Sequence, residues 1–336
     1  MAKIWYDADI DLGSVKGQTI GVLGYGIQGS AQACNMKDSG LDVVVGLRKD
    51  GESWAKAVKD GCQVAEVREV AKRADMIHIL VPDMIQAKLY RDEVRPHLKE
   101  GKALSFSHGA AIHWKWIEPP KWVDVFMVAP KAPGQRMREL YLQGSGVPAL
   151  VAVHQDYTGR AWKRILALAK ATGCSKAGLI ETTFKEEVET DWFGEQVDLC
   201  GGVDRLIRVA FETLVENGYQ PEVAYFECLH ELKLIVDLIQ KYGITGMYKR
   251  VSETARYGGL TRGKMVIGEA SKEAMRKVLS DVKSGTFARE WLAAYEKEGP
   301  NAFAKYLSDL EQHPIEDVGR RLRRMIWPDT TGQMTA

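Results

Sequence analysis

The sequence lacks the features that would place it among membrane, disulfide-stabilised or nucleic-acid-binding proteins. Apolar runs such as 123–129 are far shorter than the roughly 20 residues that a membrane-spanning helix needs. The five cysteines form no C-x-x-C pair, and their odd number and scatter indicate reduced thiols in a cytoplasmic protein. A formal net charge of +1 gives no reason to expect a nucleic acid or a membrane surface as partner. Residues 1–11 are polar and acidic, so we expect no secretory signal.

The composition and length of the chain are typical of an ordinary soluble globular protein with a large core. Hydrophobic residues make up 45% of the 336 residues, and this length is enough for two domains. No internal repeat of roughly 20–50 residues is evident. Local hydrophobic patterns along the chain then indicate the fold.

The first half of the chain alternates apolar strands with helical patterns. This alternation is typical of a doubly wound parallel sheet that helices cover on both faces. We therefore predict an α/β fold with a Rossmann-type dinucleotide-binding domain over residues 1–182. The predicted strands are 19–23, 41–47, 76–81, 103–106, 123–128 and 148–153.

A glycine-rich loop follows the first of these strands and opens a helix. A G-x-G-x-x-G pattern in this strand–turn–helix context is typical of a dinucleotide site, where the helix N-terminus faces the pyrophosphate. A plain glycine-rich turn is the alternative, and the context disfavours it. The cofactor-binding residues predicted here are Gly24, Tyr25, Gly26, Ile27 and Gln28.

The end of the second strand does not decide between NADPH and NADH. Arg48 and Lys49 suit a 2′-phosphate or the face of an adenine ring. Asp50 and Glu52 follow directly and would repel a phosphate dianion, whereas Ser53 is a neutral donor. We expect the two basic residues and Ser53 to contact the cofactor.

Three further strand ends carry polar or small residues that a ligand can approach. The carboxyl ends of parallel strands face the cofactor crevice in this fold. His108 and Lys131 each lie at such an end, and either residue taken alone could equally be structural. We expect the loop of Asp83, Met84, Ile85 and Gln86 to lie along the cofactor, and we also predict Asp83 as a helix N-cap.

From about residue 183 the strand patterns stop and long helical patterns follow. Glycines at 201–202, 218, 243 and 258–259 separate the predicted helices. We predict an all-helical domain over residues 183–328 and a disordered polar tail over 329–336.

The helical half contains two pairs of acids spaced four residues apart, Asp191 with Glu195 and Glu227 with Glu231. This spacing places each pair on one helical face that is otherwise apolar, and we expect such faces to be buried. Neighbouring buried carboxylates repel each other, and a bound cation relieves the repulsion. Oxygen ligands without Cys or His favour Mg²⁺. One such pair is usually a solvated face, but two pairs favour a metal site.

The order and spacing of these motifs resemble ketol-acid reductoisomerase in its short form. The resemblance extends from about Tyr6 to Met325, and its paired acidic motifs are highly specific. The motifs are Gly24-Tyr25-Gly26-Ile27-Gln28-Gly29, Ser107-His108-Gly109, Ala129-Pro130-Lys131-Ala132-Pro133-Gly134, Glu189-Thr190-Asp191-x-x-Gly194-Glu195-Gln196 and Glu227-x-x-His230-Glu231-Leu232-Lys233.

The resemblance implies an activity in the biosynthesis of valine, leucine and isoleucine. The family converts 2-acetolactate to 2,3-dihydroxyisovalerate, and 2-aceto-2-hydroxybutyrate to 2,3-dihydroxy-3-methylvalerate. An alkyl group first migrates between adjacent carbons, and NADPH or NADH then reduces the resulting 2-keto acid. Two Mg²⁺ ions per site would act as Lewis acid and as template during the migration.

The resemblance also implies which residues bind the metals. Asp191 would bridge the two ions and Glu195 would bind the first. Glu227 would bind the second ion, with Glu231 nearby, directly or through water.

Other site residues follow from the same resemblance. Ser252 would hydrogen-bond the substrate carboxylate, and His108 and Lys131 would help to move protons. Gly134 would bind the cofactor. In the family's short form the helical domains of two chains intertwine in a knotted arrangement. The second acidic pair and Ser252 would then complete the site of a neighbouring chain, which makes a homodimer the smallest active unit.

The cofactor loop departs from the family pattern. Gly51 stands where members that prefer NADPH often have Ser, and those members lack the acids found here as Asp50 and Glu52. We therefore expect a relaxed preference, with NADH accepted as well as NADPH.

Two other interpretations fit parts of the sequence. A metal-free β-hydroxyacid dehydrogenase combines such a sheet with helices and uses a catalytic Lys, so it would remain active in excess EDTA. A non-enzymatic nucleotide sensor or scaffold would not need the acids.

Overall fold

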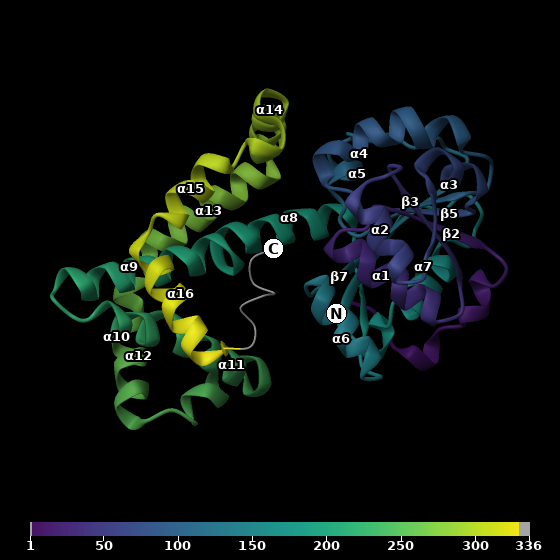
Figure 1. Ribbon diagram of the computed structural model, residues 1–336. Helices are drawn as coiled ribbons and strands as arrows, with labels where there is room; N and C mark the ends of the chain where they lie inside the picture. Colours follow the sequence, from purple (N-terminus) through teal and green to yellow (C-terminus); the bar gives the residue numbers. More distant parts are fainter. Residues whose placement is uncertain (1, 329–336) are drawn as a thin grey trace. The chain divides into compact units, whose positions relative to one another are not determined.

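The computed structural model describes residues 2–328, whose contacts divide the chain into two compact units between Thr190 and Asp191 (Figure 1). This division lies inside helix α8 (Phe184–Gly194), whereas the change of periodicity predicts a boundary between residues 182 and 183, just before that helix begins. The tail predicted to be disordered, 329–336, lies outside the described residues. No helix among residues 2–328 combines the length and apolarity needed to cross a membrane.

The first unit is built on a nine-stranded sheet with the strand order β1-β9-β8-β7-β6-β5-β2-β3-β4. The strands from β4 through β3, β2, β5 and β6 to β7 pair in parallel, as the sequence predicts. The strands are β1 (Ile4–Trp5), β2 (Thr19–Leu23), β3 (Asp42–Leu47), β4 (Gln63–Glu66), β5 (Met76–Ile79), β6 (Ala103–Phe106), β7 (Asp124–Pro130), β8 (Ala149–Gln155) and β9 (Leu179–Glu181).

The prediction of a parallel sheet is wrong for strand β8, which pairs antiparallel with β7. Ala149 of β8 lies beside Pro130 of β7, so the chain re-enters the sheet at the edge where β7 leaves it. The intervening helix α6 (Gly134–Leu142) therefore does not carry the chain back to the opposite edge, as a parallel partner would require. β1 also pairs antiparallel, with β9, and the sheet is mixed.

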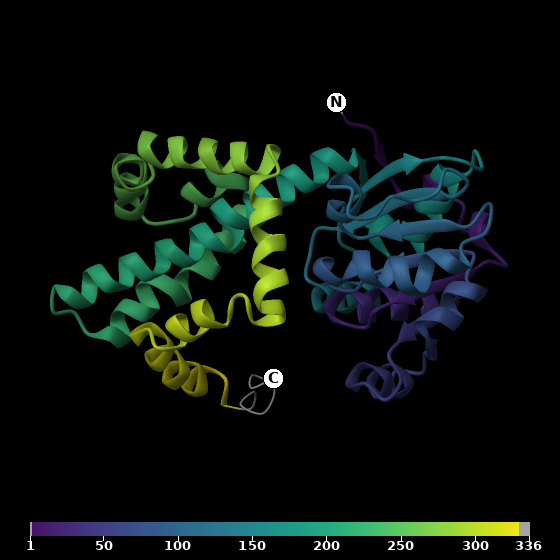
Figure 2. The same ribbon diagram turned by 90° about the horizontal axis from the view of Figure 1, so that it is seen from above.

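Helices cover both faces of the sheet, and each face has its own apolar core (Figure 2). Successive residues of a strand point to opposite faces, so Val22 belongs to one core and Leu23 to the other. The helices of this unit besides α6 and α8 are α1 (Ile27–Asp38), α2 (Glu52–Lys59), α3 (Val67–Arg73), α4 (Asp83–Leu89), α5 (Ala110–His113) and α7 (Ala161–Ala171).

The second unit is helical throughout its described length, as predicted. One of its cores is formed by α9, α10 and α16, with Phe211, Tyr225 and Val318 buried together. Its helices after α8 are α9 (Gly201–Glu216), α10 (Pro221–Tyr225), α11 (Glu231–Tyr248), α12 (Glu253–Val266), α13 (Glu269–Lys283), α14 (Thr286–Glu298), α15 (Ala304–Glu311) and α16 (Pro314–Ile326).

Two short π-helical segments interrupt the helices that carry the predicted acids. They are η6 (Glu195–Leu199), which continues α8, and η7 (Phe226–His230), which joins α10 to α11. A π turn inserts a residue into a helix and changes the direction of the side chains that follow, and such turns are frequent at functional sites. The sequence pattern did not predict them.

Some glycines of this unit interrupt a helix and others lie within one. Gly243 has non-helical torsion angles (φ 72°, ψ 170°) and kinks α11, which agrees with the predicted break. Gly258 and Gly259 lie inside α12, so the break predicted there is wrong. A Cβ atom on Gly259 would lie 3.0 Å from the Tyr248 hydroxyl, which explains this glycine by packing.

Candidate functional site

The phosphate loop is shaped by glycines that the surrounding backbone requires. Gly24 has φ of 102°, and a Cβ atom there would lie 2.9 Å from the Leu80 carbonyl oxygen. A Cβ atom on Gly29 would lie 2.3 Å from the Gly24 oxygen, whereas one on Gly26 would meet nothing within 4 Å. The first and third glycines therefore permit the turn and the close packing of α1, and the second leaves open space before the helix N-terminus for a phosphate.

This loop lies at the point where the order of the sheet reverses. β2 pairs with β3 on one side and with β5 on the other, so its carboxyl end opens into the crevice in which doubly wound folds bind ligands. Gly134, also predicted to bind the cofactor, begins α6 beside the loop. A Cβ atom there would lie 2.1 Å from the Ile27 carbonyl oxygen, so the approach of α6 to α1 requires glycine.

A cavity of about 620 Å³ lies beyond the carboxyl end of β3. Three residues predicted to bind the cofactor, Arg48, Lys49 and Ile85, line it, whereas Ser53 does not. Its four basic side chains face four acidic ones, so the lining as a whole is electrically balanced. The charged residues are Arg48, Lys49, Arg68 and Lys88, against Glu66, Glu69, Asp92 and Glu93.

The loop 83–86 departs from its prediction in one detail. Asp83 is the first residue of α4, and Pro82, not Asp83, occupies the N-cap position. The Gln86 amide is 4% exposed and donates to the Val81 carbonyl oxygen at 3.0 Å and to Asp83 Oδ1 at 2.9 Å. Gln86 therefore holds the loop in shape.

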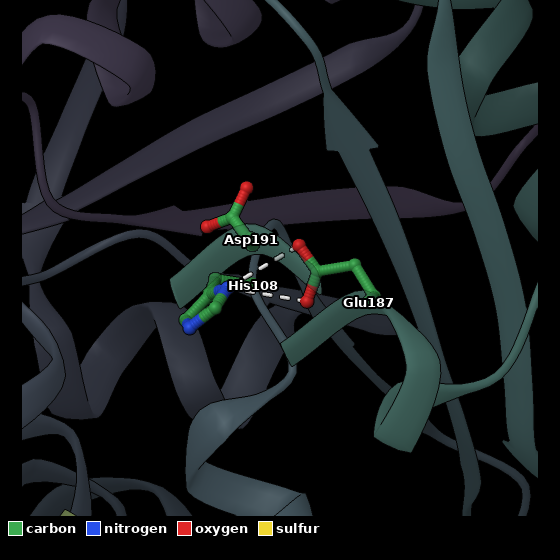
Figure 3. A group of neighbouring side chains, drawn as sticks. All are labelled: His108, Glu187 and Asp191. Atoms are coloured by element: carbon green, nitrogen blue, oxygen red, sulfur yellow. Dashed lines mark hydrogen bonds and ion pairs between the residues drawn. The ribbon is translucent and has the colours of Figure 1, made fainter. Parts of the chain in front are cut away.

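A buried carboxylate that the sequence prediction missed joins two of the predicted site residues. Glu187 of α8 is 1% exposed and accepts hydrogen bonds from the Gly109 backbone N–H at 3.0 Å and from Lys131 Nζ at 3.2 Å. His108 Nδ1 lies 3.2 Å from Glu187 Oε1 (Figure 3). Glu187 thus connects the end of β6 with the end of β7. Its spacing of four residues before Asp191 was the signal that could have identified it.

Electrostatics keep Glu187 ionised in this buried position. Burial raises its pKa, but the hydrogen bond and charge of His108, together with the charge of Lys131, more than offset that effect. The net result is a pKa below the ordinary value for a glutamate.

Asp191 follows Glu187 by one turn of the same helix. Ligand atoms of His108, Glu187 and Asp191 all lie within 4.8 Å of one another, and no other group of three potential metal ligands occurs among residues 2–328 (Figure 3). Glu187 accepts from three protein donors, and the carboxylates of Glu187 and Asp191 both offer the oxygen ligands that a hard cation prefers.

The remaining predicted metal ligands do not join this group within one chain. Glu195, Glu227 and Glu231 are exposed. The expectation of a buried face is wrong for the second pair in the single chain, whereas the face of the first pair is buried at Phe184 and Val188 and exposed from Glu195 onward. Apolar neighbours of these three acids are exposed too, with Leu199 at 66% and Leu234 at 51%. Helical periodicity shows which side chains share a face, and it cannot show what covers that face.

Ser252, predicted to bind the substrate, is the exposed N-cap of α12. Its Oγ accepts a hydrogen bond from the Ala255 backbone N–H at 3.1 Å. A serine hydroxyl in this role retains its own proton for a further acceptor.

A buried polar network, also missed by the sequence prediction, lies behind the strand ends. His78 in the middle of β5 is fully buried, and its Nε2 lies 2.8 Å from Gln32 Oε1 while its Nδ1 lies 2.9 Å from Ser105 Oγ. Burial lowers the pKa of His78 to about 4, so the imidazole is neutral. Gln32 Nε2 then donates to Ser107 Oγ at 2.9 Å and to Gln28 Oε1 at 3.1 Å.

This network extends to the next strand end, because Gln28 Nε2 donates to the Ala132 carbonyl oxygen at 2.9 Å. Hydrogen bonds therefore run from the phosphate loop to the residues that flank His108 and Lys131. These hydrogen bonds fix the position of helix α1 relative to the carboxyl ends of β6 and β7.

Comparisons with known proteins find matches to both halves of the chain. Residues 14–178 match the family model described as "Acetohydroxy acid isomeroreductase, NADPH-binding domain", and residues 184–327 match "Ketol-acid reductoisomerase, C-terminal domain". A curated protein of Cenarchaeum symbiosum named ketol-acid reductoisomerase (NADP(+)) is 65% identical over 98% of this chain and 100% of its own length. Its counterpart in Nitrosopumilus maritimus is 62% identical over the same shares.

A solved structure is also similar to the whole chain. It is an NADH-preferring ketol-acid reductoisomerase from an uncultured archaeon, with 46% identity and a TM-score of 0.93. The alignment covers 96% of this chain and 98% of that one.

Proposed function

The chain belongs to the ketol-acid reductoisomerase family, and from this membership we propose how its own residues divide the work of the reaction. The protein is an oxidoreductase and isomerase of branched-chain amino-acid biosynthesis. It converts 2-acetolactate to 2,3-dihydroxyisovalerate, and 2-aceto-2-hydroxybutyrate to 2,3-dihydroxy-3-methylvalerate, by alkyl migration followed by reduction with a nicotinamide cofactor. The observation that carries the proposal is the buried Glu187 carboxylate, which joins His108 to Lys131 one turn before Asp191.

We infer that Glu187 is a positioning residue for two catalytic ones. An ionised carboxylate beside Lys131 favours the charged ammonium, so a proton is held at Nζ. The bond from His108 Nδ1 fixes the orientation of the ring, so its other nitrogen faces away from Glu187. Lys131 and His108 can then donate and accept protons at the oxygens of the substrate.

Two Mg²⁺ ions would be held by the carboxylates of Asp191, Glu195, Glu227 and Glu231. The donor set fits, because all four side chains are carboxylates and offer the oxygen ligands that Mg²⁺ prefers. When bound, the ions would polarise the ketone and acidify the neighbouring hydroxyl. Ser252 would donate its hydroxyl proton to the substrate carboxylate.

The cofactor would lie along the phosphate loop, with its adenosine end in the cavity lined by Arg48, Lys49 and Ile85. We propose that both NADPH and NADH are accepted. The balanced charge of that cavity and the acids Asp50 and Glu52 weaken the preference for a 2′-phosphate. Proteins similar to this chain include relatives described as NADP(+) enzymes and one solved structure described as NADH-preferring, so both cofactor preferences occur among them.

A second copy of the chain completes the site in this proposal. The predicted ligands Glu227 and Glu231 are exposed, and the helices that follow them expose large apolar side chains. These are Leu234, Val236, Ile244, Tyr257, Leu260, Met265 and Val266, which are 49–77% exposed. A homodimer with intertwined, knotted helical domains would cover this surface and bring the second acidic pair and Ser252 to the partner's Asp191. We place the protein in the cytoplasm, where its thiols stay reduced and this biosynthesis provides substrate.

The deciding experiment follows the oxidation of NADPH and of NADH with 2-acetolactate, with Mg²⁺ and with excess EDTA. Turnover with both cofactors that EDTA abolishes is the expected result. Activity that persists in EDTA would favour the metal-free dehydrogenase interpretation and exclude the metal roles assigned here. Sedimentation in the same buffer should give a dimer or a multiple of it, and an active monomer would exclude the shared site.

A further inference from the structure

Two cysteine thiols meet at the hydroxyl of Tyr25, the residue between the first two glycines of the phosphate loop. Tyr25 Oη lies 3.3 Å from Cys34 Sγ and 3.5 Å from Cys62 Sγ, and it donates to Asp60 Oδ2 at 2.9 Å. Both cysteines are free thiols. We call these four residues the thiol cluster, and no step of the reaction uses it.

The fold holds the two cysteines in place from both sides. Cys62 follows the end of α2, where the backbone N–H groups of Gly61 and Cys62 donate to helix carbonyls at 2.9 and 3.0 Å. Gly61, at φ of 71°, permits this ending. Lys37, one turn after Cys34 on α1, donates from Nζ to the Asp60 carbonyl oxygen at 2.8 Å. The turn that carries Cys62 is therefore tied to the helix that carries Cys34.

The two thiols differ in acidity. The hydrogen bond with Cys62, followed by the charge of Arg138, lowers the pKa of Cys34, although burial opposes this shift. The hydrogen bond with Cys34, together with burial, raises the pKa of Cys62. Cys34 is therefore the thiolate-forming partner and Cys62 the thiol that resolves it.

Access to the cluster is narrow. Cys34 is 9% exposed and Cys62 is 8% exposed, whereas Cys174 is completely buried. The first two cysteines therefore keep a little contact with solvent, whereas the third has none.

We propose that Cys34 and Cys62 form a thiol modification site that hydrogen peroxide converts to a reversible disulfide, and that this change weakens cofactor binding at the phosphate loop. The Cys34 thiolate attacks one peroxide oxygen; an S–O bond forms, the O–O bond breaks, and hydroxide leaves to become water. The sulfenic acid is then attacked by Cys62 sulfur, which forms the S–S bond and releases a second water. Two electrons pass from the two sulfurs to the peroxide, and a dithiol reverses the step.

The disulfide changes the environment of Tyr25. Its sulfurs lie about 2.05 Å apart and offer no S–H donor to the Tyr25 oxygen. Tyr25 then keeps only Asp60 of its three partners. Because Gly24 and Gly26 have no side chains, the 3% exposed Tyr25 side chain is the anchor of this part of the loop. The effect on cofactor affinity rests on the proposed cofactor site, whereas the formation of the disulfide does not.

The test uses the full-length protein, treated with hydrogen peroxide and then alkylated and digested for mass spectrometry. We expect a linked peptide pair that joins Cys34 to Cys62 and disappears on reduction with dithiothreitol. Fluorescence titration with NADPH alone should show a Kd increase of about threefold or more in the oxidised protein, the loss expected for a weakened hydrogen bond. Reduction should restore the original Kd.

Variants separate this site from general oxidation. Cys34→Ala and Cys62→Ala should each form no linked pair and keep their NADPH affinity after peroxide. Cys200→Ser removes an exposed thiol and should respond as the wild type does. Absence of the linked pair in the wild type would overturn the modification site, and a linked pair with unchanged affinity would overturn its coupling to the loop. Failure of the reduced wild type to bind NADPH would instead reject the proposed cofactor site.

Discussion

Glu187→Gln removes one negative charge at constant side-chain size from a position that is 1% exposed. The carboxylate accepts from the Gly109 N–H at 3.0 Å, from Lys131 Nζ at 3.2 Å and from His108 Nδ1 at 3.2 Å. A glutamine has one acceptor oxygen, and its amide nitrogen would face a donor in place of an acceptor. The variant therefore leaves Lys131 or His108 without the partner that Glu187 provides.

Hydrogen bonds to charged groups contribute about 1.5–3 kcal/mol each. Lys131 is 33% exposed, so solvent replaces part of its lost interaction. We expect the free energy of unfolding to fall by about 1–2 kcal/mol and kcat to fall about 100-fold, or about 2.7 kcal/mol. The larger effect is on turnover, because the proton held at Lys131 Nζ loses its neighbouring negative charge.

The assay measures kcat and KM for 2-acetolactate across pH, together with urea unfolding. The alkaline limb of the kcat profile should move to lower pH, since the Lys131 ammonium loses stabilisation. Glu186→Gln is the matched control, because this neighbour on α8 is exposed and should change stability by no more than about 0.5 kcal/mol. A kcat within about threefold of wild type, with an unshifted profile, would refute the positioning role of Glu187.

The depressed pKa of Glu187 also predicts a pH dependence of stability. The folded protein binds the proton less readily than the unfolded chain, so the contribution is fully present above the ordinary value of 4.5. It is lost as the pH falls through the lower folded value. Wild type should therefore lose its stability advantage over Glu187→Gln on acidification below that pH, and a constant difference would contradict the assignment.

Three further predictions concern other parts of the molecule. Glu227→Gln should lose turnover while its unfolding curve stays near that of wild type, and near-normal turnover would remove its metal role. The ratio of kcat/KM for NADPH over NADH should stay below about 100, or about 2.7 kcal/mol, and a larger ratio would contradict the interpretation of residues 48–53. His78 has a pKa lowered from 6.5 to about 4, so the wild type should lose stability as pH falls from 6.5 to 4. His78→Gln should flatten that slope in urea unfolding, and an unchanged slope would show that other groups cause it.

Several features of the fold were predictable because they depend on local pattern. The strands 19–23 and 103–106 are reproduced as β2 and β6, since apolar runs between helical patterns define them. The antiparallel entry of β8 was not predictable, because it depends on the direction in which α6 returns the chain. The two π-helical segments, which contain Glu195 and Glu227, were not predictable either, because a single inserted residue barely alters helical periodicity.

The sequence by itself determined the family and the types of residue at the site. The G-x-G-x-x-G loop and the paired acids are short motifs whose chemistry depends on local backbone shape and on spacing along a helix. His108 and Lys131 lie at predicted strand ends, and the family resemblance, not their position alone, gave them a role at the site.

Only the tertiary structure decided how these residues are held. Glu187 receives its three hydrogen bonds from donors 78, 79 and 56 positions away in the chain. His78 and Gln32 connect the phosphate loop to the strand ends through the interior of the sheet. The thiol cluster likewise joins Cys34 to Cys62 through Tyr25. Side-chain partners so distant along the chain are brought together by packing, and no local pattern encodes which of them will meet.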